Sequence, residues 1–230
     1  MENPTQIILP HGGYKNLIAY KKSETIYQGT VIFCRRFLNA YKDRTVDQMT
    51  QAARSCKQNI AEGSAASGTS KETELKLTNV ARASLDELLG DYIDQLKSHN
   101  LAEWDYNDDK KIVGRQYAEN HPDWGQHWMD IFTTRPPETI CNLIMIIIYQ
   151  TRYLLDKMIK TQENDFLKHG GVRERMYNAR KISRGLTFEN ELFNRLSQAQ
   201  TPAELLALSQ RLIAAINKTQ YRIRQDRHWM

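Results

Sequence analysis

The sequence predicts an all-α protein, an elongated antiparallel four-helix bundle with a C-terminal helical extension, and two observations support this fold class. Only 11 of the 230 residues are glycine and 6 are proline, and these helix-breaking residues cluster at a few positions. Between them, apolar residues recur every three or four positions, which is the spacing of one face of an α-helix. We therefore expect long helices that are interrupted at defined points.

Three parts are expected along the chain: an extended N-terminal segment (1–13), the four-helix bundle (14–168) and a C-terminal helical suffix (169–230). Within the bundle, residues 101–138 are expected to form an irregular connection with one or two short helices. This connection holds three of the four tryptophans, Trp104, Trp124 and Trp128. Their rings either cap one end of the bundle or bind a partner.

The first bundle helix is expected to run from Tyr14 or Ser23 to about Lys42, with Ser23 or Thr25 as its N-cap. One apolar stripe consists of Ile26, Thr30, Phe33, Phe37 and Tyr41, and a second row beside it consists of Tyr27, Val31, Cys34 and Leu38. These two rows exceed what one four-helix core can bury. We expect the excess to lie in contacts between subunits, which predicts a homo-oligomer.

The second helix is expected from about Val46 to Ala65. Thr45 with Gln48 resembles a capping box at its start, and Gly63 together with the small residues that follow it (64–68) is expected to end it. Its apolar residues form a heptad seam: Val46, Met49, Ala53, Cys56 and Ile60.

The third helix is expected to begin at a cap on Thr69 or Ser70 and to reach about His99. Its stripe consists of Leu77, Ala81, Leu85, Leu88, Tyr92 and Leu96.

The fourth helix is expected to begin after Pro137 and to stop at Gly170-Gly171. Apolar residues surround it near Leu143–Tyr149, so we expect it to be the most buried element. The suffix is expected to contain three helices, over 172–184, Phe188–Ala199 and Pro202–His228.

The composition argues against several classes of function. The three cysteines, Cys34, Cys56 and Cys141, form no CxxC or Cys/His cluster, which favours a reducing, cytoplasmic location and predicts no metal site. Isolated glycine pairs offer no phosphate-binding loop, and we expect no cofactor. No signal peptide is expected, and the most apolar run is far shorter than the roughly 20 residues of a membrane span.

Charge is distributed unevenly along the chain, whose net charge is +5. Residues 1–44 carry 7 Lys/Arg against 3 Asp/Glu, residues 45–167 carry 13 against 19, and residues 168–230 carry 12 against 5. The basic ends and acidic middle can steer a polyanion to one region. They can equally serve contacts between the end of one subunit and the middle of another.

Two basic clusters are candidate nucleic-acid sites. The spacing of the first places five residues on one helical face, with cations around a ring that can stack: Arg173, Tyr177, Arg180, Lys181 and Arg184. The alternative is a solvated face, or an anchor for the acidic middle of a neighbouring subunit. The second cluster combines Lys218, Arg222, Arg224 and Arg227 with Tyr221 and Trp229 at a terminus that can fray.

A further motif spans the second and third helices: Arg54, Asn59, Glu62, Gly63, Arg82, Ser84 and Glu87. Glu62 opposes the dipole near a helix C-terminus, so it needs a positive partner or backbone amides, and Arg82 or Arg54 is a candidate. Ser84 is small enough to allow close helix packing. We interpret this motif as structural and assign no catalytic residue to it.

The same segment resembles a known family. The string Asn59-Ile60-Ala61-Glu62-Gly63, then Lys71-Glu72, then Ala81-Arg82-Ala83-Ser84-Leu85 with Glu87 is similar to the S23-type four-helix bundle proteins. These are encoded in intervening sequences of bacterial 23S rRNA genes and are related to the accessory variability determinant proteins of diversity-generating retroelements. The flanks, Leu9–Tyr14, Arg135–Glu138 and Gly170–Met176, resemble the subgroup with a "four helix bundle suffix" domain.

The resemblance implies four antiparallel helices, a ring-like homo-oligomer (pentameric in close relatives), and nucleic acid or a reverse transcriptase as partner. Core members of this family are basic overall, whereas residues 45–167 here are net acidic, which moves the expected DNA or RNA contact towards the termini. We therefore expect a non-enzymatic accessory protein. The alternative is a protein–protein interaction module with no nucleic-acid role.

A second alternative is a ribonuclease. HEPN-type ribonucleases are helical bundles that use an Arg-x(4–6)-His pair, and two pairs here have this spacing: Arg115 with His121, and Arg222 with His228. Pro122 disfavours a helical conformation at His121, which weakens the first pair.

Overall fold

The computed structural model describes residues 8, 11–39, 44–199 and 201–226, and it describes the backbone alone at 185–190, 215–216 and 218–226. All regular structure in these ranges is helical, comprising one 3-10 turn, η1 (Tyr14–Asn16), and eight α-helices. The all-α prediction is confirmed. The chain divides into two compact units, one formed by residues 8–172 and the other containing the chain from Arg173 on.

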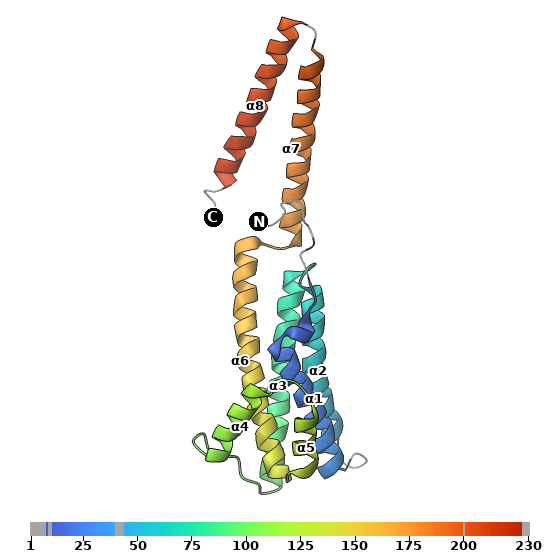
Figure 1. The fold of residues 1–230 in the computed structure, drawn as a ribbon, viewed down its shortest axis with the longest axis vertical. Coiled ribbons are helices and arrows are strands. Elements are labelled where there is room, and N and C mark those ends of the chain that lie inside the picture. The colour runs from blue at the N-terminus through green and yellow to red at the C-terminus, as the bar shows by residue number, and fades with distance from the viewer. Residues whose placement is uncertain (1–7, 9–10, 40–43, 200, 227–230) are drawn as a thin grey trace. The chain divides into compact units, whose positions relative to one another are not determined.

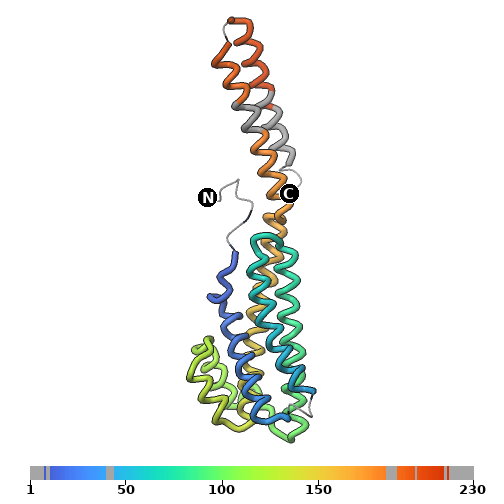
Figure 2. The backbone as a smooth tube through the Cα atoms, turned by 90° about the vertical axis from the view of Figure 1, so that its right-hand side faces the viewer, coloured from blue at the N-terminus to red at the C-terminus, as the bar shows by residue number. Residues whose placement is uncertain are grey.

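Four long helices form a bundle in the first unit: α1 (Ile18–Phe37), α2 (Thr45–Ala66), α3 (Lys71–Ser98) and α6 (Pro137–His169). Each packs against two of the others in the cyclic order α1, α2, α3, α6. Figures 1 and 2 show that neighbours in this order run antiparallel.

The core lies where the four apolar stripes meet. The predicted heptad seam of α2 is buried from Met49 to Ile60, and the α3 stripe is buried from Ala81 to Leu96. Tyr92 is fully buried, and its hydroxyl donates to Thr30 Oγ1 at 3.0 Å. Residues 143–148 of α6 are all buried, in agreement with the predicted burial of this helix.

Helix α1 differs from the prediction at both ends. Neither Ser23 nor Thr25 caps it, because α1 begins at Ile18 and both hydroxyls donate to backbone carbonyls three or four residues earlier. The helix ends at Phe37 and not at Lys42, since Leu38 is already extended. Lys42 and the predicted stripe residue Tyr41 lie outside the described residues.

The predicted bounds of α2 are confirmed to within one residue, but the predicted capping box is not formed in this described turn. Arg44 occupies the N-cap position, and no side-chain cap bond is present in this described turn, so Thr45 is already inside the helix. The helix passes through Gly63 and ends at Ala66, within the run of small residues that was predicted to stop it. Gly63 brings α2 close to α3, since an added Cβ would lie 3.4 Å from Leu77 Cβ.

Other helix boundaries match their predicted signals. Ser70 caps α3, its Oγ accepting from the Thr73 N–H at 3.1 Å. Gly170 follows α6 with φ of 63°, a left-handed conformation that favours glycine.

The Trp-rich connection contains two short helices, α4 (Asp109–Asn120) and α5 (Gln126–Thr134). They lie along the flank of the bundle, α4 on α6 and α5 on α1, and do not cap its end. The ring of Phe132 lies against Gly29 of α1 and stacks with Trp128, both rings being fully buried. Helix α5 therefore packs on the side of α1 that carries Gly29.

The second unit contains α7 (Val172–Gln198) and α8 (Pro202–Asp226), which lie side by side in both views. The prediction of two short helices before Pro202 is wrong, because α7 is continuous over 27 residues. Gly185 lies at the predicted break, but one glycine costs a helix only about 1 kcal/mol and no proline follows it there. Leu192 is buried near the turn between the two helices.

Candidate nucleic-acid interface

The first half of α7 carries one basic face. Its five predicted residues, Arg173, Tyr177, Arg180, Lys181 and Arg184, are all helical and all exposed. At 3.6 residues per turn they span an arc of about 100° around the helix. The Tyr177 side chain is 68% exposed, so its ring is open to solvent among the cations.

The arginines of this face are not neutralised within the described structure. Arg173, Arg180 and Arg184 make no ion pair with any described carboxylate, whereas Lys181 interacts with another residue. An unpaired guanidinium keeps its full set of N–H donors, whose planar fork matches phosphate oxygens. The face can therefore bind a polyanion without first breaking internal ion pairs.

The second basic cluster stays a prediction, because the structure describes the end of α8 by its backbone alone, up to residue 226. Arg222 and Arg224 belong to α8, where residues two apart lie about 200° apart around the axis. Their side chains, together with Arg227 and Trp229, lie outside what the structure describes.

The predicted structural motif forms a polar link between α2 and α3. The Nδ2 group of Asn59 donates to the Ser55 carbonyl at 2.8 Å and to its hydroxyl at 3.1 Å. The hydroxyl of Ser55 lies 3.0 Å from that of the buried Ser84. Sequence reasoning missed Ser55, although its position four residues before Asn59 puts both on one helical face.

The predicted partners of Glu62 are wrong. Arg82 pairs instead with Asp156 of α6, with Nη1 3.0 Å from Oδ1, and it also donates to Asn79. Glu62 and Arg54 are exposed, and neither forms an ion pair with a described residue. An exposed carboxylate keeps its hydration and so needs no cation. Glu87 is likewise exposed on α3.

The two side chains of the predicted ribonuclease pair, Arg115 and His121, contact different partners. The guanidinium of Arg115 lies over the Tyr106 ring, 4.4 Å from its centroid, and donates to the Tyr106 carbonyl. His121 follows the last residue of α4, and its ring stacks on Tyr117. The non-helical backbone of His121 agrees with the effect expected from Pro122. His228 lies outside the described residues.

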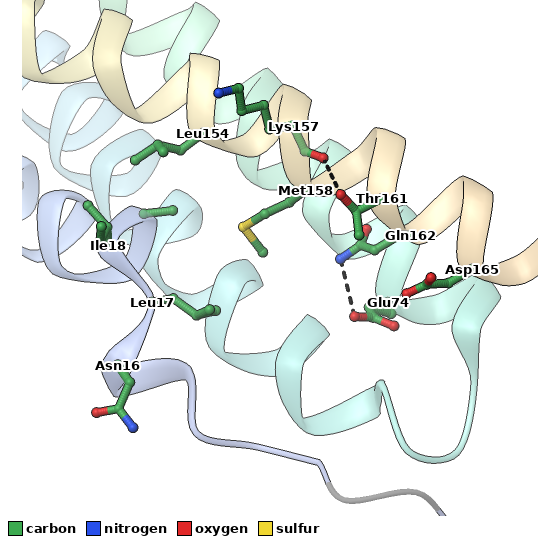
Figure 3. Close-up of a pocket in the computed structure, with 11 residues that line it drawn as sticks. Asn16, Leu17, Ile18, Glu74, Leu154, Lys157, Met158, Thr161, Gln162 and Asp165 are labelled. Atoms are coloured by element: carbon green, nitrogen blue, oxygen red, sulfur yellow. Dashed lines mark hydrogen bonds between the residues drawn. The ribbon is translucent and has the colours of Figure 1, made fainter. Parts of the chain in front are cut away.

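A groove of about 530 Å³ lies between the start of α1 and the second half of α6. Figure 3 shows Leu17 and Met158 lining it and the carboxylates of Glu74 and Asp165 at one end. Glu74 also accepts a hydrogen bond from Gln162 at 3.2 Å. Glu74 is in turn paired with Lys71, whose Nζ lies 2.9 Å from the Glu74 Oε2 atom.

The described chain has no features typical of a metal site, a membrane-spanning helix or a reactive cysteine. No group of three or more His, Cys, Asp or Glu side chains in it is placed to hold a metal ion. No described helix combines the length and hydrophobicity that a membrane crossing requires. All three cysteines are buried free thiols, and burial raises the pKa of Cys141 to about 12, which disfavours the reactive thiolate.

Comparisons with protein-family models, with curated proteins and with solved structures each gave no match. The geometry and charge of the α7 face are therefore the features of the molecule that indicate a function.

Proposed function

We propose that this protein is a non-enzymatic, oligomeric accessory protein that binds nucleic acid, or an enzyme acting on nucleic acid such as a reverse transcriptase, through the basic face of α7. The observation that carries the proposal is the set of exposed arginines, Arg173, Arg180 and Arg184, without carboxylate partners among the described residues. The resemblance to the S23-type bundle proteins supports the same class of partner and a ring-like, pentameric assembly.

The face suits binding that does not depend on sequence. From Arg173 to Arg184 the helix rises about 16 Å, which equals about five nucleotides of a stacked strand at 3.4 Å each. Arginines that contact phosphates carry no base information, and a tyrosine ring stacks on any base. We therefore expect strong salt dependence and little preference among sequences.

The test replaces Arg180 and Lys181 by alanine and measures affinity for a single-stranded oligonucleotide over a range of salt concentrations. Each neutralised phosphate contributes a slope of about −0.7 in log K against log salt for single strands. Loss of two cations should make the slope shallower by roughly 1 to 1.5 for each subunit engaged. Neither side chain is buried, so the fold should be unaffected.

A matched control removes the same charge from the bundle. Arg54→Ala with Lys160→Ala deletes one arginine and one lysine that are exposed and form no ion pair with a described residue. This control should leave the salt slope unchanged. Equal slopes for the wild type and the Arg180/Lys181 variant would refute the proposal.

A protein-interaction role is the second candidate, favoured by an acidic face on α3. Glu87 and Asp94 are exposed there, whereas Asp86 is paired with Arg152 of α6, and burial together with the charges of Glu87 and Asp94 raises the pKa of the Asp91 carboxyl. A basic face from another subunit would relieve this repulsion. In that case the Arg180/Lys181 variant should weaken assembly, measured by light scattering, and leave nucleic-acid affinity unchanged.

A further inference from the structure

A small cavity of about 340 Å³ lies between α4 and α6 in the first unit. Two residues one turn apart on α4, Lys111 and Arg115, face Ile146, Tyr149 and Gln150 of α6, and Tyr106 completes the lining. Its volume is at the low end of the range of about 300–1,000 Å³ that is typical of small-molecule sites.

The polar groups of the cavity are held in place before any ligand arrives. Gln150 is fixed at both ends, since its Nε2 donates to the Arg115 carbonyl at 3.1 Å and its Oε1 accepts from the buried Lys22 at 2.8 Å. Lys111 donates to the Trp104 carbonyl at 2.7 Å. Arg115 is fixed by the ring and the carbonyl of Tyr106. Such preorganisation lowers the entropy lost on binding.

The charge of the lining favours an anion. Arg115 is half-buried and forms no ion pair with any described carboxylate, and within the described structure its guanidinium donates one hydrogen bond, to the Tyr106 carbonyl. Lys111 has a distant counter-ion, with its Nζ 3.9 Å from Glu103 Oε1. A carboxylate in the cavity would supply the charge partner that Arg115 lacks, in a site partly shielded from water.

The remaining walls favour a flat ring. Tyr106 and Tyr149 present aromatic side chains, and the buried Ile146 supplies an aliphatic surface. Aromatic rings pack well against tyrosine, and a planar ring loses little conformational entropy on binding. We propose that this cavity binds a small planar aromatic carboxylate, with Arg115 and Lys111 holding the carboxylate and the two tyrosines contacting the ring.

The experiment titrates the full-length protein with four probes by calorimetry: 2-naphthoate, neutral 2-naphthalenemethanol, cationic 2-naphthylmethylamine and inorganic phosphate. We expect saturable binding of 2-naphthoate, weaker binding of the alcohol, and none of the amine or of phosphate alone. Arg115→Gln should weaken naphthoate binding about tenfold or more, since a hydrogen bond to a charged group is lost. Tyr106→Ala should also weaken it, and this side chain is 75% exposed, so its loss leaves the core intact.

Two control variants separate this cavity from general attraction to positive charge. Lys110→Gln removes a cation from the neighbouring position on α4, outside the cavity lining, and the Arg180/Lys181 double variant removes two from α7. Both should bind naphthoate as the wild type does. The proposal is overturned if naphthoate does not bind at millimolar concentration, if the amine binds equally well, or if Arg115→Gln and Tyr106→Ala both leave its affinity unchanged.

Discussion

Lys22 of α1 is a buried cation whose two hydrogen-bond acceptors are both neutral. Its side chain is 4% exposed, and its ammonium donates to the Ala118 carbonyl and to Gln150 Oε1. Burial lowers the pKa of Lys22 to about 8 from 10.5, and the charge of Glu119 opposes this shift. The residue thus joins α1, α4 and α6 and places a titrating group beneath the proposed ligand cavity.

This pKa shift predicts how stability changes with pH. Between about pH 8 and 10.5 the unfolded chain binds the Lys22 proton more tightly than the folded protein does. The free energy of unfolding therefore rises with pH in that window, by roughly 2–3 kcal/mol in total from this group. Urea unfolding of the wild type and of Lys22→Met from pH 7.5 to 10 measures the effect. The difference between the two proteins should change with pH, and parallel curves would contradict the assignment.

Two helical glycines allow a matched test of packing. At Gly29 an added Cβ would lie 2.7 Å from Phe132 Cε2, whereas at the exposed Gly90 of α3 it would meet nothing within 4 Å. Gly29→Ala should therefore destabilise the protein by about 1–3 kcal/mol, because a buried ring must move. Gly90→Ala should stabilise it by about 0.5–1 kcal/mol through helix propensity. Chemical denaturation compares both with the wild type, and stabilisation by Gly29→Ala would show that α5 does not pack as described.

At the scale of elements, apolar periodicity predicted which segments are helical, and local capping was less predictable. The seam of α2 and the stripe of α3 are buried as their spacing indicates. Ser23 and Thr25 misled the prediction because a hydroxyl inside a helix bonds its own preceding turn as readily as it caps an end. The break predicted before Phe188 is absent because a glycine such as Gly185 is tolerated inside a helix at modest cost.

The continuity of α7 yields a prediction that distance measurement can test. Spin labels at Asn178→Cys and Gln198→Cys, both exposed, flank the predicted break near Gly185. A continuous helix places their Cα atoms about 30 Å apart, at 1.5 Å per residue. Pulsed electron paramagnetic resonance should give one narrow distribution near this value, and the buried native cysteines should not react with the label. A shorter or broad distribution would restore the two-helix interpretation.

At the scale of the whole molecule, contacts between segments distant in sequence were the least predictable feature. The ion pair of Arg82 with Asp156 joins residues 74 positions apart, and no local pattern identifies it. The flanking position of α5 on α1 likewise depends on Phe132 fitting against Gly29. The basic face of α7 was predictable because all five residues lie on one helix, where spacing alone sets their directions.

The central claim is that nucleic acid lies along this face, and photochemical crosslinking tests it most directly. A single-stranded oligonucleotide containing 5-bromouracil would be irradiated with the full-length protein, and the attached peptides identified by mass spectrometry. Because Tyr177 is 68% exposed among the cations, we expect the principal crosslink at this residue or within 172–184, and its loss in the Arg180/Lys181 variant. Crosslinks confined to the bundle helices, or none at low salt, would contradict the account.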